Sequence, residues 1–359
     1  MTSNATTWLA SAPVRTADIG AWTDTWFAGV GAVCNIAIEH RAQVIIVHDP
    51  DSSPMVDLAL AITGERYSFR PGEAPGRHTI IEHAIAAAMP SGSVVINIDD
   101  SIEAGSGLGT SAAVMVALVA GLLACDGRSV DPADIATRAH LYETSTGKQS
   151  GVQDHWASAW GGISLFAVEY PAVVRTQVAI TDTTAAELTR RLHTVYLGSP
   201  HASSALHDEV IAQLETQRAG CLDEMRAAAI AAAAALADGD LDAYGGALSA
   251  HNEAVRIMHP GLIGRDALEL GDLAERLGAS GWKVNGAGGE GGSMVVLGPP
   301  NVEDNAALRA AIEGRSGWRV IQAGLGAHGV RVERQPDRAT IARVGGVWDE
   351  NHSVSGDRR

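Results

Sequence analysis

IEAGSGLGTSAAVMVALVAGLLA, residues 102–124, is the most informative segment of the sequence. Residues 94–98 before it are apolar and β-branched, which predicts a short strand. The run at 112–124 is uniformly apolar, which predicts a helix buried on most sides. A strand, a glycine-rich turn and a buried helix in this order indicate a mixed α/β domain with a functional loop at the helix N-terminus.

The turn between this strand and helix has the composition of a phosphate-binding loop. Glycines at 105, 107 and 109 allow positive φ angles, so that successive N–H groups can converge on one anion. The helix dipole adds positive potential at the same point, and Thr110 and Ser111 supply hydroxyls, one of which could bind a metal ion. The alternative is an ordinary strand-to-helix turn, which rarely needs three glycines and two hydroxyls. The loop lacks the Gly-Lys-Ser/Thr ending of a Walker A motif.

A second glycine-rich segment, residues 286–292, formally matches the dinucleotide pattern G-x-G-x-x-G. That pattern should follow a strand and open a helix, whereas this segment leads into a predicted strand at 293–297. We therefore reject a Rossmann assignment.

The remaining pattern predicts two domains. We expect a strand or hairpin at 33–47, helices at 80–89 and 267–277, and a helix capped by Asp131 with Pro132 in its first turn. Alanine-rich helices at 227–236 and 240–257 follow a change of composition near residue 184, with Asp240 as a cap. The boundary is placed between domains at 1–180 and 181–359.

Composition excludes several classes of protein. The chain has 359 residues, of which 46% are hydrophobic, so it is not intrinsically disordered. Its longest apolar run is far shorter than the ~20 residues of a membrane span, and its start lacks the pattern of a secretory signal. The formal charge is −16 without any basic run, which argues against nucleic acid or a membrane surface as partner. Three scattered cysteines predict free thiols in the cytoplasm.

Three carboxylates are candidates for chemistry beside the loop: Asp24, Glu143 and Asp154. Any one of them could be an ordinary surface group. Asp154 stands apart because Val152 and Trp156 flank it, so it should be partly buried, and a buried carboxylate needs a partner or a function. For His155 and His201, structural and functional roles are both open.

Three motifs together resemble those of the GHMP kinases. Ala12-Pro13-Val14-Arg15 resembles their N-terminal Ala-Pro-x-Arg motif, residues 105–113 their phosphate loop, and residues 285–292 their third, glycine-rich motif, in which Glu290 departs from the usual glycine. Within the family, residues 20–25, 31–37, 151–162 and 196–204 are similar to those of anomeric sugar kinases of the heptose 7-phosphate kinase and L-fucokinase type. His201 stands where arginine is usual. The resemblance implies an α+β fold with an N-terminal domain like ribosomal protein S5 domain 2 and a ferredoxin-like C-terminal domain.

The resemblance also implies roles for individual residues. Asp154 would be the base or orienting carboxylate for the sugar hydroxyl, with Arg15 beside it to keep it ionised and stabilise developing charge. Mg²⁺ would be held by Ser111 and Glu143. The ATP-binding residues would be Gly105, Gly107, Leu108, Gly109, Thr110 and Ser111. The substrate-binding residues would be Asp24, Thr23, Gly151, His201, Gly288 and Gly289.

The function implied is ATP-dependent phosphorylation of the anomeric hydroxyl of a sugar, with a heptose 7-phosphate or related long-chain sugar phosphate as the first expectation. The alternatives are an unphosphorylated sugar of the fucose, galactose or uronic acid type, a non-sugar alcohol such as mevalonate, and a non-catalytic relative that senses sugar and ATP. The expected partner is the small-molecule substrate, and the protein would be a monomer or homodimer.

Overall fold

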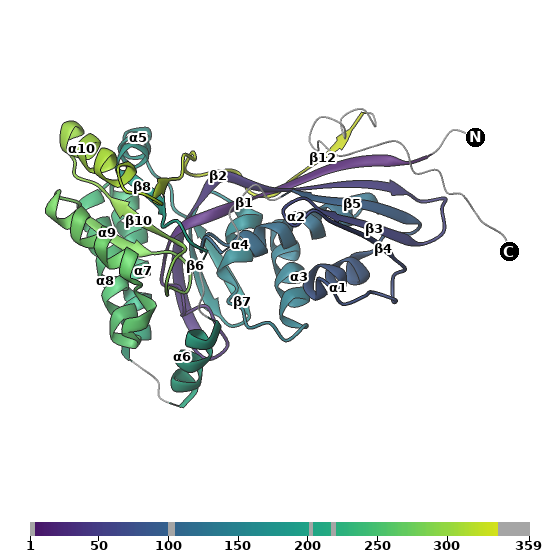
Figure 1. Cartoon of the computed structure of the whole chain (residues 1–359), viewed down its shortest axis with the longest axis horizontal. Coiled ribbons are helices and arrows are strands. Elements are labelled where there is room, and N and C mark those ends of the chain that lie inside the picture. Colours follow the sequence, from purple (N-terminus) through teal and green to yellow (C-terminus); the bar gives the residue numbers. More distant parts are fainter. Residues whose placement is uncertain (1–3, 100–104, 201–203, 217–219, 337–359) are drawn as a thin grey trace.

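The computed structural model describes residues 4–99, 105–200, 204–216 and 220–336 (Figure 1). Its largest element is an eight-stranded sheet in the order β12-β1-β2-β5-β3-β4, with β6 paired to β2 and β7 paired to β6. The strands are β1 (Thr6–Ile19), β2 (Val30–Asp49), β3 (Met55–Leu60), β4 (Glu65–Phe69), β5 (Ser93–Asp99), β6 (Ile163–Glu169), β7 (Ala172–Gln177) and β12 (Arg331–Gln335). The predicted strand or hairpin at 33–47 is a single strand, β2, whose first half pairs with β6 and second half with β5.

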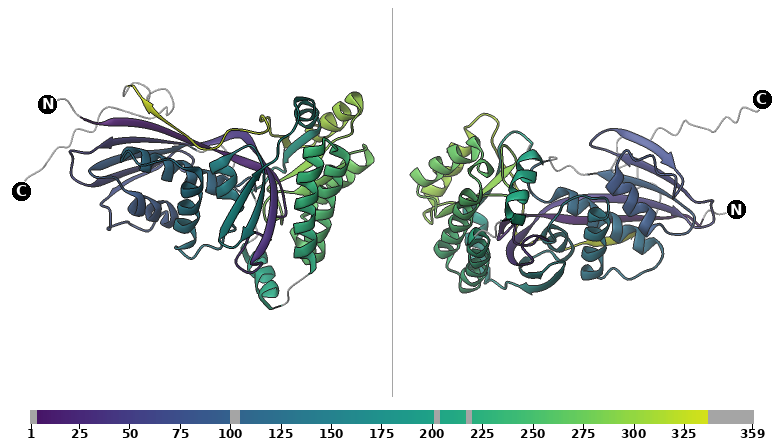
Figure 2. Two further views of the ribbon diagram at one scale, coloured as in Figure 1. Left: turned by 180° about the vertical axis from the view of Figure 1, so that it is seen from behind. Right: turned by 90° about the horizontal axis from the view of Figure 1, so that it is seen from below.

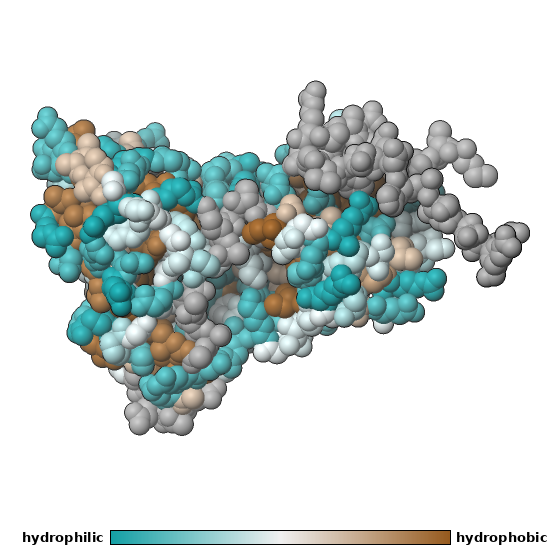
Figure 3. All heavy atoms as spheres, in the orientation of Figure 1, coloured by the Kyte–Doolittle hydropathy of each residue, from teal (hydrophilic) through white to brown (hydrophobic). Residues whose placement is uncertain are grey.

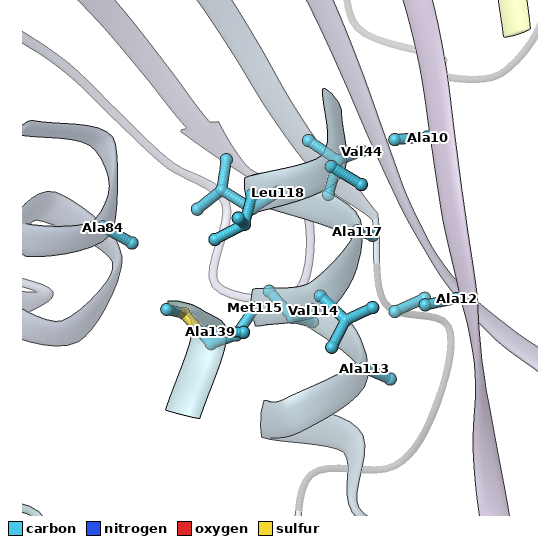
Figure 4. Close-up of a cluster of buried hydrophobic side chains, with 14 of the residues drawn as sticks. Ala10, Ala12, Val44, Ala84, Ala113, Val114, Met115, Ala117, Leu118 and Ala139 are labelled. Atoms are coloured by element: carbon cyan, nitrogen blue, oxygen red, sulfur yellow. The ribbon is translucent and has the colours of Figure 1, made fainter. Parts of the chain in front are cut away.

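Four helices cover one face of this sheet: α1 (Thr79–Ala88), α2 (Thr110–Cys125), α3 (Pro132–Thr144) and α4 (Gln153–Trp160). The uniformly apolar helix α2 is buried from 112 to 124, as its sequence predicts. Figure 4 shows the reason: Ala113 and Ala117 of α2 face Ala10 and Ala12 of β1, while α1 and α3 lie on the other side of the helix. Helix α2 is therefore the centre of a sheet–helix–helix stack, and its N-terminus has a fixed position.

A second, smaller sheet lies beside the first and is fully antiparallel, in the order β11-β8-β10-β9. Its strands are β8 (Leu192–Tyr196), β9 (Gly281–Val284), β10 (Ser293–Leu297) and β11 (Arg319–Val320). The accompanying helices are α5 (Asp182–Arg191), α6 (Ser204–Thr216), α7 (Gly220–Asp238), α8 (Leu241–Met258), the short 3₁₀ helix η1 (Pro260–Leu262), α9 (Arg265–Arg276) and α10 (Val302–Glu313).

The two parts share an alanine-rich core. Buried alanines of α7 pack against residues near the end of β1 and the start of β2, including Ala17, Ile19 and Ala32. Seen from behind in Figure 2, α7 and α8 stand alongside these strand ends. The predicted caps are confirmed, since the side chain of Asp131 accepts hydrogen bonds at the start of α3 and that of Asp240 at the start of α8.

The chain returns to the first sheet near its C-terminal end, where β12 pairs antiparallel with β1. The expected α+β fold class is confirmed, while the division at residues 180 and 181 stays a prediction. Among the described helices, none combines the length and apolarity required to cross a membrane. On the face shown in Figure 3, hydrophobic residues form small patches separated by hydrophilic ones. Cys34, Cys125 and Cys221 are free thiols, as expected.

Candidate active site

The glycine-rich loop has the backbone conformation that its sequence predicts. Gly105, Gly107 and Gly109 have φ angles of 73°, 75° and 76°, in the left-handed region. Gly109 is the N-cap of α2, and among the described residues no side chain caps this end of the helix. Within the same part of the chain, the buried hydroxyls of Ser106 and Thr110 have no hydrogen-bond partner. A helix N-terminus without a side-chain cap and two hydroxyls without a partner among the described residues fit an anionic group such as a phosphate.

The loop is held from two sides. The carbonyl of Leu108, whose side chain is fully buried, accepts a hydrogen bond from the backbone N–H of Arg15 at 3.1 Å. A Cβ atom at Gly107 would lie 2.9 Å from the carbonyl oxygen of Asn285, in the third motif. Glycine is therefore required at 107 for close approach as well as for its φ angle. Two segments almost 180 residues apart in sequence form one surface.

Arg15 and Asp154 meet at the end of this loop. The Arg15 Nε donates to Asp154 Oδ1 at 2.7 Å, and its Nη1 donates to the carbonyl of Gly107. Asp154 lies in the first turn of α4, and a Cβ at Gly109 would lie 3.2 Å from its Cγ. Burial opposes the charged form of Arg15, but Asp154 and Asp18 outweigh it and raise the pKa of the guanidinium. The sequence prediction that pairs Arg15 with Asp154 agrees with this geometry.

A buried ion pair that the sequence analysis missed supports Arg15. Asp18 Oδ2 lies 3.3 Å from Arg15 Nη2, and Asp18 Oδ1 accepts from Lys283 Nζ at 2.6 Å. Both Asp18 and Lys283 are fully buried. Asp18 also accepts from the backbone N–H of Gly286 at 3.0 Å, which ties it to the third motif. Burial lowers the pKa of Lys283, although the attraction of Asp18 works against this shift.

Asp24 is placed by the N-terminus of α4. Its Oδ2 accepts from the backbone N–H of Gln153 at 2.9 Å, and a Cβ at Gly151 would lie only 2.1 Å from the same oxygen. Burial raises the pKa of Asp24 to about 6, and the nearby charge of Asp154 adds to the shift. Thr23 is buried beside it, where its hydroxyl donates to Gly20 O at 2.7 Å and accepts from Ala32 N–H at 3.1 Å. Thr23 thus fixes the turn that carries Asp24, and direct contact of Thr23 with substrate stays a prediction.

Glu143 lies beside the first turn of α2. Its Oε1 is 3.4 Å from Ser111 Oγ and pairs closely with Lys148 Nζ, while its Oε2 is 2.6 Å from His155 Nε2. Burial opposes ionisation, yet His155 and Lys148 outweigh it and lower the pKa of Glu143. Ser111 and Glu143, which the sequence predicts as metal ligands, are thus adjacent. His155, for which the sequence left a structural and a functional role open, is a partner of Glu143.

A cavity of about 600 Å³ opens beside these groups. Its described lining includes the acidic residues Asp18, Asp24 and Asp154, the aromatic residues Trp22, Trp26 and Phe27, and residues 147–151. His207 of α6 also lines it and makes an edge-on ring contact with Trp22, with centroids 5.5 Å apart. In Figure 1 the connection between β1 and β2 reaches α6. The arrangement suits a polyhydroxylated molecule with one apolar face.

Two further predicted residues lie outside the described lining of this cavity. A Cβ at Gly288 would meet the carbonyl of Leu262 at 2.3 Å, and Gly289 N–H donates to the same carbonyl at 2.6 Å. These glycines pack the third motif onto η1, and their contact with substrate stays a prediction. Glu290 accepts from the backbone N–H of Arg265 at 3.3 Å, so the departure from the usual motif supplies an acceptor at the start of α9. His201 lies outside the described residues.

Comparison with known proteins gives a family match and a set of similar folds. Residues 78–162 match the family model for the GHMP kinases N terminal domain. No curated protein matches the chain. Among solved structures, the chain is similar to a D-glycero-D-manno-heptose 1-phosphate kinase from Bacteriodes thetaiotaomicron, with 18% identity, a TM-score of 0.72 and coverage of 92% of this chain and 100% of the other.

Two other solved structures share the fold. One is the Lactococcus lactis galactokinase complexed with galactose, with 17% identity, a TM-score of 0.69 and coverage of 91% of this chain and 95% of that one. The other is the Streptococcus pneumoniae phosphomevalonate kinase in complex with phosphomevalonate and AMPPNP, with 14% identity, a TM-score of 0.68 and coverage of 92% and 99%. The resemblance to the GHMP kinases is confirmed: residues 78–162, which include the loop, Glu143 and Asp154, match the model of their N-terminal domain, and 92% of the chain shares the fold of the heptose 1-phosphate kinase structure.

Proposed function

We propose that this protein is an ATP-dependent sugar kinase. The observation that carries the proposal is the meeting of Arg15 and Asp154 with the glycine-rich loop at the edge of one cavity. Phosphoryl transfer needs a bound donor phosphate, an acceptor hydroxyl held in line with it, and positive charge beside the group in transit. This chain offers a group for each requirement, and the domain match at 78–162 supports the same chemistry.

In this mechanism the loop amides from Gly107 to Thr110 and the hydroxyls of Ser106 and Thr110 would hold the phosphates of ATP. The second carboxylate oxygen of Asp154 would accept a hydrogen bond from the acceptor hydroxyl, orient it and take its proton. The acceptor oxygen would form its bond to the γ-phosphorus as the bond from that phosphorus to the bridging oxygen breaks and ADP leaves. The Arg15 guanidinium, fixed by Asp154 and Asp18, would face the negative charge that develops on the transferred group. Asp24 would accept hydrogen bonds from other hydroxyls of the sugar.

Ser111 and Glu143 fit Mg²⁺ as hard oxygen donors 3.4 Å apart beside the phosphate loop. Among the described residues there is no cluster of three or more His, Cys, Asp or Glu side chains able to hold a metal, so phosphate oxygens and water would complete the coordination. A bound Mg²⁺ would neutralise phosphate charge during transfer.

The acceptor we propose is the anomeric hydroxyl of a heptose 7-phosphate or related long-chain sugar phosphate. The motifs around Asp24, Asp154 and Tyr196 and the fold similarity to a heptose-phosphate kinase support this choice.

A specific observation favours a neutral sugar as the second candidate. Two of the cations that line the cavity, Arg15 and Lys148, already pair with carboxylates, and Asp18, Asp24 and Asp154 face the same space. A distal phosphate would have to find its cation elsewhere.

One experiment tests both candidates. ADP release is measured with hexoses, 6-deoxyhexoses, uronic acids, heptose phosphates and mevalonate, and the product is identified by NMR. We expect an anomeric phosphate on a heptose phosphate. Efficient use of an unphosphorylated hexose, with heptose phosphates inert, would establish the neutral-sugar alternative. A product phosphorylated away from C1 would refute anomeric transfer, and binding of sugar and ATP without ADP release would identify a sensor.

A further inference from the structure

Lys148 occupies the position between the two side chains assigned to the metal. Its Nζ pairs with Glu143 Oε1 and lies 3.3 Å from Ser111 Oγ. Helix α3 ends at Thr144, and the turn that follows folds back, with Gly147 N–H donating to Thr144 O at 2.9 Å and Thr146 Oγ1 to Glu143 O at 2.7 Å. Because of this turn, Lys148 reaches back over the carboxylate that precedes it by five residues.

Glu143 needs a cation at this point. Its side chain is only 2% exposed, and an ionised carboxylate removed from water is costly unless it is paired. His155 lies against one oxygen, and Lys148 compensates the other. The lysine is not itself locked in place, since 41% of its side chain is exposed and the residue also lines the sugar cavity.

We propose that Lys148 is a built-in cation that holds the metal position while nucleotide is absent and leaves it when Mg²⁺ binds. The identity of the metal rests on the proposed function. A single ammonium and a divalent ion compete for the same two oxygens, so the lysine preserves the geometry of Glu143 and at the same time weakens the binding of free metal. After displacement, the ammonium is released into the cavity that Lys148 lines, where it can meet a phosphate of the nucleotide.

The first test measures metal binding without nucleotide or sugar. Mn²⁺ serves as the probe, and the free ion is counted from its EPR signal at constant pH and low ionic strength. We expect Lys148→Met to bind Mn²⁺ about tenfold more tightly than the unmodified protein, because one ion pair to a buried carboxylate is lost as a competitor. Lys148→Arg keeps the competing charge and should bind within about twofold of the unmodified protein.

Two controls locate the effect. Arg138→Met removes one positive charge from α3, the helix that carries Glu143, where Arg138 pairs with Asp134 at 2.8 Å, and should leave Mn²⁺ affinity unchanged. In the double variant Lys148→Met/Glu143→Gln the gain should disappear. The proposal is overturned if Lys148→Met binds Mn²⁺ no more tightly than the unmodified protein, if Arg138→Met gives the same gain, or if the double variant retains it.

Lysine chemistry gives a second, independent readout. The chain contains two lysines, and the other, Lys283, is fully buried, so an amine-acetylating reagent followed by mass spectrometry can follow Lys148 against an internal buried reference. Mn²⁺ should accelerate acetylation of Lys148 several-fold in the unmodified protein. In Glu143→Gln the rate should already be high and insensitive to Mn²⁺.

Equal rates in all of these conditions would overturn the proposal. Because neither test uses a sugar, they are separate from the question of kinase activity. Failure of every sugar to release ADP would refute the proposed function while leaving the metal competition to be judged from Mn²⁺ binding alone.

Discussion

The guanidinium of Arg15 bridges two aspartates, with Nε 2.7 Å from Asp154 Oδ1 and Nη2 3.3 Å from Asp18 Oδ2. Asp18 is held in turn by Lys283 of β9, at 2.6 Å. The position of the Arg15 guanidinium therefore depends on a strand of the second sheet as well as on its own strand, β1. The candidate catalytic pair and the junction between the two parts of the molecule are one network.

Replacement of Asp154 by asparagine should abolish turnover without loss of the fold. The variant keeps a hydrogen-bond acceptor for Arg15 but cannot take the proton of the acceptor hydroxyl, and general-base assistance is typically worth ~10² to 10⁴ in rate. ADP release and ATP affinity are measured in parallel, with the exposed Asp238→Asn on α7 as a control. Activity of Asp154→Asn within a few-fold of the control would remove Asp154 from the mechanism.

Asp24→Asn should stabilise the protein and weaken sugar binding. The pKa of Asp24 is raised from 3.8 to about 6, so between these values the folded state keeps a proton that the unfolded state has lost. The stability contributed by this protonation is complete below about pH 3.8 and is lost as pH rises through about 6. Asparagine does not ionise, and its carbonyl can still accept from Gln153 N–H.

The gain in the free energy of unfolding of Asp24→Asn should therefore be small at pH 4 and on the order of 3 kcal/mol at pH 7.5. Urea unfolding across this pH range measures it, and sugar KM is measured at pH 7.5, where it should rise. A difference in unfolding free energy that is the same at every pH would show that Asp24 ionises normally.

Ser111→Ala should raise the Mg²⁺ concentration needed for half-maximal activity on the order of tenfold, while sugar affinity stays unchanged. The reason is loss of one of two hard oxygen donors beside the phosphate loop. Ser111→Thr retains the hydroxyl and should behave like the unmodified protein. A collapse of sugar affinity in Ser111→Ala, with no change in its Mg²⁺ dependence, would place Ser111 in the acceptor site.

Local sequence determines the features that could be predicted. The loop at 105–111, helix α2 and the caps Asp131 and Asp240 depend on residues a few positions apart, so glycine content, periodicity and capping chemistry are enough to find them. The resemblance to the GHMP kinases supplied the pairing of Arg15 with Asp154, which are 139 residues apart and which composition alone could not bring together.

The contacts that were missed are long-range or ambiguous. Asp18 and Lys283 are separated by 265 residues, and each taken alone reads as a surface charge. Lys148 follows a glycine in a polar stretch and reads as an exposed turn residue, so its contact with Glu143 was not expected. One signal was present: the chain has only two lysines, and each lies within a few residues of a motif. Whether a charged residue is buried can be judged only from a structure that contains both members of its ion pair.

Lys283→Met should destabilise the protein and slow turnover together. Removal of one partner leaves the carboxylate of Asp18 buried, with Arg15 and the N–H of Gly286 as its remaining partners, at a cost of about 3 kcal/mol in the free energy of unfolding. The unbalanced Asp18 should also draw Arg15 away from Asp154, which lowers kcat more than it changes ATP affinity.

The double variant Asp18→Asn/Lys283→Met removes both charges and should recover part of the stability. Arg226→Met, which breaks an exposed pair with Asp223 on α7, should cost less than about 1 kcal/mol. Urea unfolding and steady-state kinetics are measured on the unmodified protein, the two single variants Asp18→Asn and Lys283→Met, and the double variant. Additive losses from the two single variants would show that Asp18 and Lys283 are not energetically coupled.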